Sequence, residues 1–218
     1  KVVLSGLGGD ELFAGYDTFV AECFARPYLR APALARRAVA AVALALPPSD
    51  RRMSLSMRAR RFVRGLDPSP VVRNLRWFGS FLPEEAAALV VGGPPAESIY
   101  EDLLARSYPG KGQSALELWT GWYLPDDVLT KVDRASMAVS LEVRAPLLDP
   151  ELARFAHSLP YKYKVRGLTR KWIFKRALRG RLPDSIVARP KQGFGAPNGR
   201  WLRGPLREEV ESLLDRRR

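Results

Sequence analysis

The spacing of hydrophobic residues predicts a chain built mainly of helices, with few strands. From Leu12 to Phe24 the apolar residues recur three and four positions apart, which is the period of one face of an amphipathic helix. Between 26 and 76 helical segments continue, separated by prolines, and Pro83 is predicted to open a further short helix. The apolar run at 2–4 is short and continuous instead, which is typical of a buried strand.

The second half of the chain carries clearer helix boundaries. An apolar helix at 116–123 is predicted to end at Pro125, so that Asp126 caps the helix after it. Asp149 is predicted to cap a helix that has Pro150 in its first turn. Two more helices are expected toward the C-terminus, one capped by Thr169 and closed by Gly180, and one over 200–214 with Pro205 near its start.

The first sixteen residues combine a strand, a glycine-rich loop and a helix start. The loop Ser5-Gly6-Leu7-Gly8-Gly9 can adopt positive φ angles, and Asp10 and Glu11 follow it directly. Backbone N–H groups in such a loop attract phosphate, and a carboxylate at its rim can hold a metal ion that phosphate also binds. A plain turn with a capping aspartate is the commoner reason for this pattern, so these residues alone favour the plain turn.

Composition indicates one globular domain with unevenly distributed charge. The 218 residues are 46% hydrophobic and 27% charged, which is enough apolar material for one sizeable core. The net charge is +13, and the basic residues are concentrated in 26–76 and 161–218, on either side of an acidic middle. Such segments could bind nucleic acid or ATP, or face solvent. Because no nucleic-acid-binding motif with interleaved aromatic residues is present, we interpret most arginines as solvated surface and expect no nucleic-acid partner.

The single cysteine and the single histidine restrict the chemistry. Cys23 leaves no disulfide or multi-cysteine zinc site, so a reducing, cytoplasmic location is expected, and its thiol is predicted to be buried on the first helix. His157 has no second histidine or cysteine near it in the sequence and is predicted to be a surface or packing residue. The longest apolar stretch, 38–46, is too short to span a bilayer, so no membrane partner is expected.

Three blocks of the sequence resemble the synthetase domain of glutamine-hydrolysing asparagine synthetases. KVVLSGLGGDELFAGY, at 1–16, is similar to a loop of that family that reads roughly SGxGxDExFxGY. LPDDVLTKVDRASMAVSLEVRAPLLD, at 124–149, and KWIFKRALRGRLPDSIVARPKQGFGAP, at 171–197, resemble two further blocks in the family's order. The resemblance implies that 1–218 is one partial synthetase domain, mainly α in this part, within an α/β fold of the adenine nucleotide α-hydrolase-like (HUP, PP-loop) type.

The resemblance also implies roles for individual residues. On the residues alone, Lys191 is a loop lysine between a proline and two glycines, and Glu142 is a carboxylate among apolar neighbours that Arg144 could pair. In the family, the lysine contacts phosphate and stabilises transition-state charge, and the glutamate orients the catalytic group. The implied site is Ser5, Gly6, Gly8 and Gly9 for ATP, Asp10 for Mg²⁺, Asp133 and Arg134 for the substrate, and Lys191 and Glu142 for catalysis.

The implied reaction is ATP-dependent amide formation. Adenylation of the aspartate side-chain carboxylate would release pyrophosphate, and ammonia from a glutaminase domain would then give asparagine and AMP. The family's pyrophosphate loop and glutaminase domain are expected upstream of Lys1, so 1–218 alone is expected to bind ATP weakly and to make no asparagine. A homodimer is a further expectation. The interpretation requires the glycine loop and Lys191 to converge on one triphosphate pocket.

One residue departs from the family pattern and keeps alternatives open. Leu7 stands where asparagine synthetases usually have a glutamate and β-lactam synthetase has a tyrosine, and leucine transfers no proton. A relative with the same adenylation chemistry and another carboxylate acceptor is therefore the second hypothesis. A basic helical module that binds nucleic acid is the third, ranked below the other two; it predicts a steep salt dependence of binding to generic DNA.

Overall fold

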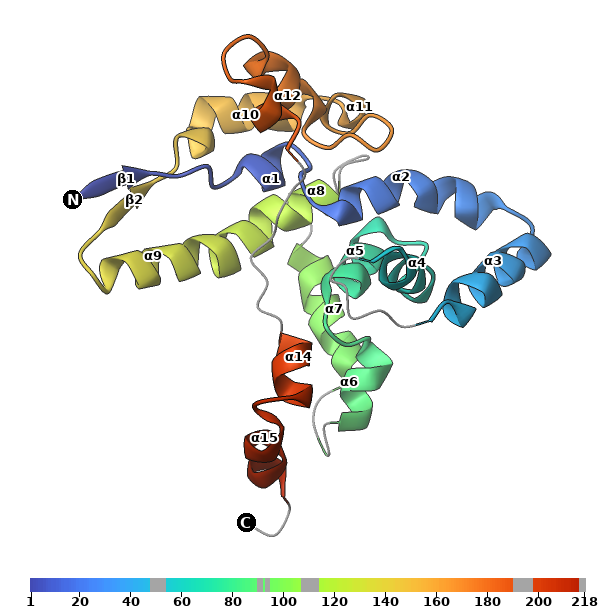
Figure 1. Ribbon diagram of the computed structural model, residues 1–218. Coiled ribbons are helices and arrows are strands. Elements are labelled where there is room, and N and C mark those ends of the chain that lie inside the picture. Colours follow the sequence, from blue (N-terminus) through green and yellow to red (C-terminus); the bar gives the residue numbers. More distant parts are fainter. Residues whose placement is uncertain (48–53, 90–91, 93–94, 107–113, 190–197, 216–218) are drawn as a thin grey trace.

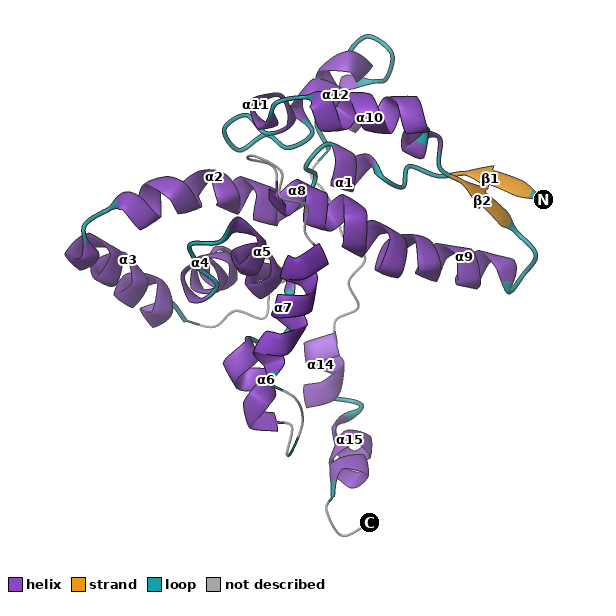
Figure 2. Ribbon diagram, turned by 180° about the vertical axis from the view of Figure 1, so that it is seen from behind, coloured by secondary structure: helices purple, strands orange, loops and turns teal. Residues whose placement is uncertain are grey.

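The computed structural model describes residues 1–47, 54–89, 92, 95–106, 114–189 and 198–215, and this part of the chain is mainly helical, as the sequence predicts. Figure 1 shows the helices in sequence colours and Figure 2 shows the same molecule from behind. Among the described residues, no helix has the length and apolar character needed to cross a membrane. The helices are α1 Gly9–Leu12, α2 Asp17–Arg30, α3 Ala33–Ala45, α4 Leu55–Arg64, α5 Pro70–Phe78, α6 Pro83–Leu89, α7 Ala96–Arg106, α8 Ser114–Leu118, the π-helix η1 Trp119–Leu129, α9 Thr130–Met137, the 3-10 helix η2 Pro146–Leu148, α10 Pro150–Ser158, α11 Tyr161–Lys164, α12 Trp172–Leu178, α13 Asp184–Val187, α14 Asn198–Arg203 and α15 Arg207–Leu214.

Two short strands that lie far apart in the sequence pair in parallel (Figure 2). The strand β1 spans Val2–Leu4 and β2 spans Glu142–Arg144, with Val3 opposite Val143. The predicted strand is confirmed, but the prediction that it is buried is wrong for this structure, since all three side chains of β1 are exposed. Within the described residues the sheet has two strands, and two strands leave most of each face open to solvent.

The predicted first helix is divided into two. Positive φ at Ala14 turns the chain between α1 and α2, and the Gly15 N–H donates to the Asp10 carbonyl at 2.8 Å. Cys23 is exposed, which corrects the prediction that it is buried. The buried residues of α2 are Phe19 and Ala25, and Glu22 lies midway between them on the inward face of the helix. Cys23 is the next residue, so its side chain leaves the helix about 100° away from that face.

The prediction that a helix ends at Pro125 and a new one is capped by Asp126 is wrong. The helix continues from α8 through the π-helix η1 into α9, with Pro125 inside it. A wider turn lets the helix pass a proline, because the ring no longer meets the carbonyl four residues earlier. The Thr130 hydroxyl donates to the Pro125 carbonyl at 2.9 Å and satisfies it within the same helix.

The predicted boundaries of the later helices are partly confirmed. Asp149 caps α10 by accepting hydrogen bonds from the backbone N–H groups of the first turn, as expected. Thr169 does not cap α12, because it pairs with Arg166 across a tight turn and the helix begins after Lys171 instead. The single helix expected over 200–214 is two helices, α14 and α15, because Pro205 cannot continue a helix.

The core consists of three clusters of buried apolar side chains. One joins α2, α8, η1 and the end of α11 around Phe19 and Trp119, and another joins α1 to α10 and α12 around Leu12 and Phe13. The third lies between α5, α7 and α8. The cluster around Leu12 and Phe13 holds α1 against the helices that follow β2, so residues far apart in sequence meet beside the glycine loop.

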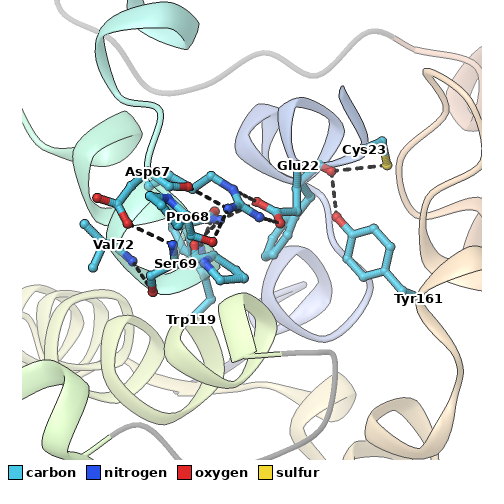
Figure 3. Close-up of polar contacts among 12 residues, drawn as sticks. Glu22, Cys23, Asp67, Pro68, Ser69, Val72, Trp119 and Tyr161 are labelled. Carbon is cyan, nitrogen blue, oxygen red and sulfur yellow. Dashed lines mark hydrogen bonds and ion pairs between the residues drawn. The ribbon is translucent and has the colours of Figure 1, made fainter. Parts of the chain in front are cut away.

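A buried ion pair lies beside these clusters (Figure 3). Arg73 on α5 is 1% exposed; its Nε donates to a Glu22 carboxylate oxygen at 2.8 Å, and a second guanidinium N–H reaches the other oxygen of that carboxylate. The third guanidinium nitrogen, Nη1, donates to the carbonyls of Asp67 and Pro68 at 2.8 and 2.9 Å. Asn74 joins Glu22 to the Trp119 indole N–H. The network ties α2 to α5, and its donors satisfy the buried charge.

Candidate functional site

The glycine loop leaves β1 at Ser5 and turns sharply at Gly8. The Ser5 N–H donates to the Arg144 carbonyl at 2.8 Å, which continues the strand pairing into the loop. Gly8 has φ +85°, and a Cβ at this position would lie 2.2 Å from the Leu148 side chain. Both the backbone conformation and the close approach therefore require glycine at Gly8. The loop residues Gly8 and Gly9 are buried, and Gly9 is the first residue of α1.

Asp10 forms an ion pair with Lys171. The Asp10 Oδ1 lies 2.9 Å from the Lys171 Nζ, and both side chains are about three-quarters buried. Gly15 lies against them, since a Cβ on Gly15 would be 1.8 Å from the Asp10 Oδ1 and 2.4 Å from the Lys171 Cε. The pair therefore occupies a tight space between the loop and the turn after α1. It joins the first and third sequence blocks.

Lys171 was not among the predicted site residues. Lys171 lies just before α12 with a positive φ of 52°, and the sequence gives no signal for this conformation because lysine rarely adopts it. The available signal was its position as the first residue of the third family-like block. The neighbouring residue Arg170 forms an ion pair with Asp17. The other carboxylate oxygen of Asp17 lies 3.3 Å from the Arg58 Nη2.

Glu11, next to Asp10, points into the protein and is 2% exposed. The Tyr16 hydroxyl donates a hydrogen bond to the Glu11 Oε1. The Tyr16 ring stacks on Trp119, with ring centroids 4.4 Å apart. It packs edge-on against Tyr123, with ring centroids 6.0 Å apart. Burial, followed by the hydrogen bond to Glu11, raises the pKa of the Tyr16 phenol well above its ordinary value, so Tyr16 is a neutral donor.

The strand pairing places Glu142 beside the start of β1 and Arg144 beside its end, where the glycine loop begins. Glu142 is opposite Val2 on the neighbouring strand, and its carboxylate accepts from the Arg144 Nε at 2.8 Å, so the predicted partner is confirmed. Both side chains are more than half exposed, which corrects the expectation of a costly carboxylate among apolar residues. Because β1 and β2 are parallel, the chain following each strand emerges at the same end of the sheet.

The remaining predicted residues are placed less closely, or lie outside the described part. Asp133 and Arg134 lie on α9, where both are exposed. Lys191 lies outside the described residues, so its convergence with the loop stays a prediction. His157 is half-buried and bonds to the Thr120 hydroxyl and the Ala153 carbonyl, consistent with the expected packing role.

The residues at the loop fit a metal that is held jointly with phosphate. Within the described ranges no group of three His, Cys, Asp or Glu side chains could hold a metal ion alone. Mg²⁺ in nucleotide sites commonly takes only one or two protein carboxylates and completes its shell with phosphate and water. Asp10 could supply such a carboxylate, and Lys171 shows that a cation is accommodated beside it.

Comparisons with known proteins agree with the resemblance. The family model described as asparagine synthase matches residues 1–218. A protein of Mycobacterium tuberculosis (strain ATCC 25618 / H37Rv), provisionally named a glutamine-hydrolysing asparagine synthetase, is 34% identical over 212 residues, covering 93% of this chain and 31% of that protein. No solved structure matches the chain.

Two further relatives differ from each other in name. Asparagine synthetase [glutamine-hydrolyzing] 1 of Bacillus subtilis (strain 168) is 28% identical and covers 98% of this chain and 33% of that protein. Amidase chyE of Penicillium rubens is 26% identical and covers 98% of this chain and 35% of that protein. The chain thus spans about a third of the length of the curated relatives that it matches. Through the family model that covers all of its residues, the chain belongs to the asparagine synthase family.

Proposed function

We propose that the full-length protein adenylates the side-chain carboxylate of aspartate with ATP and transfers ammonia, derived from glutamine, to the acyl carbon. The products would be asparagine, AMP and pyrophosphate. Family membership supports the class of reaction, ATP-dependent amidation, and the names of the bacterial relatives support the substrates. The observation that carries the proposal is the ion pair of Asp10 and Lys171 beside the glycine loop.

In this proposal the loop binds the nucleotide through its backbone. Ser5, Gly6, Gly8 and Gly9 would face the nucleotide, because residues without side chains let the backbone approach a ligand closely. Mg²⁺, when bound with Asp10, would neutralise charge on the phosphates. Lys171 would exchange its bond to Asp10 for a phosphate oxygen when MgATP binds, so the site keeps its charge balance.

The other residues are proposed to act on the acceptor. Lys191 would stabilise the charge that develops on the phosphates in the transition state, a contribution on the order of a few kcal/mol in a dry site. Glu142 would orient the catalytic group, and Asp133 and Arg134 would bind the substrate. We further propose that 1–218 is one part of a synthetase domain of the HUP type, and that a glutaminase domain on the same full-length chain supplies ammonia, with a homodimer as the assembly.

A second function has the same chemistry with another carboxylate acceptor. Leu7 favours it, because no proton can be transferred at the position where the asparagine synthetases usually have an acid. The Leu7 N–H is bonded to the Ser5 hydroxyl at 3.2 Å, so the loop is ordered without an acid there. The similarity to a protein named an amidase is compatible with this alternative.

ATP–pyrophosphate exchange by the full-length protein tests both functions. With aspartate as the acceptor, we expect exchange that requires Mg²⁺; exchange with another carboxylate from a panel, and none with aspartate, would select the second function. Lys171→Met is expected to reduce exchange about 10- to 100-fold, because it removes one charge from the phosphate site. Lys162→Met, an exposed neighbour on α11, serves as the control. Absence of exchange with every carboxylate would overturn the proposal.

A further inference from the structure

Glu11 is a buried carboxylate directly beside the proposed metal ligand. A buried carboxylate is costly unless hydrogen bonds replace its lost hydration, and the Tyr16 hydroxyl supplies one. Asp10 and Glu11 are consecutive residues of α1, so their side chains leave the helix about 100° apart. When Glu11 is held toward the core, Asp10 is directed toward Lys171 and the glycine loop.

The helix α1 is too short to fix this orientation by itself. It has four residues, and one helical turn has little stability of its own. It begins at the loop residue Gly9, and after it the chain turns at Ala14, which has positive φ. Contacts from outside the helix must therefore set the direction in which Asp10 points.

Tyr16 provides such a contact from a fixed place. Its ring is stacked on Trp119, which is 3% exposed, and the Trp119 indole N–H donates to Asn74 in the buried network of α2 and α5. The residue before Tyr16, Gly15, lies against the Asp10 carboxylate and donates its backbone N–H to the Asp10 carbonyl. The phenol thus connects α1 to the aromatic core on η1.

We propose that Tyr16 is a positioning residue: its hydrogen bond to Glu11 acts together with the packing of Leu12 to fix the rotation of α1, and thereby aims the Asp10 carboxylate at the metal and phosphate. The inference rests on the proposed function, because it assigns to Tyr16 an effect on MgATP that acts through Asp10. Tyr16 touches neither metal nor phosphate in this account. The competing interpretation is that the hydrogen bond only stabilises the fold.

Tyr161→Phe is a matched control for Tyr16→Phe. The Tyr161 hydroxyl donates to the Phe19 carbonyl at 2.6 Å, and its ring packs against the same aromatic cluster (Figure 3). Both substitutions delete one hydrogen-bonded phenol hydroxyl and keep the ring. Only Tyr16 is bonded to α1, so the two variants separate a general loss of stability from a change at Asp10.

The test is calorimetric binding of MgATP, and of ATP with EDTA, to the full-length protein and the two variants, with melting temperatures measured in parallel. We expect Tyr16→Phe to weaken MgATP binding about tenfold, with little change for metal-free ATP, and Tyr161→Phe to leave both affinities within about twofold. Equal effects of the two variants on MgATP affinity, or none for Tyr16→Phe, would overturn the positioning role. Failure of the unaltered protein to bind MgATP would instead overturn the proposed function, and this inference with it.

A second pair of variants covers the case in which Tyr16→Phe does not fold. Glu11→Gln keeps an acceptor for the Tyr16 hydroxyl, whereas Glu11→Leu removes it and keeps a similar volume. We expect Glu11→Leu to weaken MgATP binding at least fivefold more than Glu11→Gln does. Equal losses in the two variants would count against positioning through this hydrogen bond.

Discussion

At the scale of single residues, burial gives Lys164 unusual properties. It is the last residue of α11 and is fully buried, and burial lowers the pKa of its ammonium from 10.5 to about 8. The folded protein therefore releases this proton at a lower pH than the unfolded chain does. Between about pH 8 and 10 the unfolded chain binds more protons at this residue, so its contribution to the free energy of unfolding increases with pH.

Lys164→Met is predicted to remove that pH dependence. Relative to the variant, the unaltered protein should gain stability as the pH is raised from about 7.5 to 9.5, because the penalty for a buried charge is relieved by deprotonation. Urea unfolding at several pH values measures the difference. In Lys162→Met, on the exposed side of the same helix, the free energy of unfolding should change with pH as it does in the unaltered protein. If the free energies of unfolding of the unaltered protein and Lys164→Met differ by a constant amount across this pH range, the prediction is contradicted.

At the scale of elements, side-chain caps and backbone breaks determine where the helices begin and end. Ser54, Ser69 and Asp149 each accept a hydrogen bond from the first turn of the helix that follows. Asp149 accepts two, from Glu151 and Leu152, at 3.0 and 3.1 Å. Because α10 carries Ala156 into the cluster that holds α1, this cap supports the packing beside the glycine loop.

Asp149→Ala is predicted to lower the free energy of unfolding by about 0.5–2 kcal/mol, since it leaves two backbone donors without their partner. Asp149→Asn keeps an accepting oxygen and should recover most of the loss. Glu151→Ala, which alters the same turn without removing the cap, is the comparison. If Asp149→Ala and Glu151→Ala are equally stable in urea unfolding, the cap contributes nothing specific.

At the scale of the whole molecule, polar links join helices that are far apart in the sequence. Arg73 and Glu22 join α5 to α2 in a buried pair, and Asp17 at the start of α2 joins Arg170 and Arg58 from two other regions. The pair of Arg207 and Glu211 on α15, in contrast, is exposed and lies within one helix. Buried pairs are costly to break because the remaining charge has no partner, whereas exposed pairs contribute little.

Arg73→Met is therefore predicted to destabilise the protein by about 3–5 kcal/mol, and Arg207→Met by less than about 1 kcal/mol. The double variant Arg73→Met with Glu22→Leu should be more stable than Arg73→Met alone, because no buried carboxylate is left unpaired. Unfolding in urea gives all four free energies. A double variant less stable than Arg73→Met would show that the pair is not the dominant interaction there.

Some of the fold and part of the site follow from local sequence signals. The apolar run at 2–4, the cap at Asp149 and the helical spacing are properties of neighbouring residues, and the structure confirms them. The glycine loop was recognisable because positive φ at Gly8 needs glycine whatever the surroundings. The family was recognisable from three blocks in order, without any knowledge of how they pack.

The rest depended on contacts between distant residues. Only the tertiary structure places Glu142 beside β1 and Lys171 against Asp10, because strand pairing and ion pairs across more than a hundred residues leave no periodic trace in the sequence. Cys23 is exposed because Glu22, next to it on α2, faces inward toward Arg73. The helix continues through Pro125 because the π-helix η1 has wider turns. The sequence thus determined the local conformations and the family, whereas the packing of helices around α1 decided which side chains face the site, since burial is a property of the assembled core.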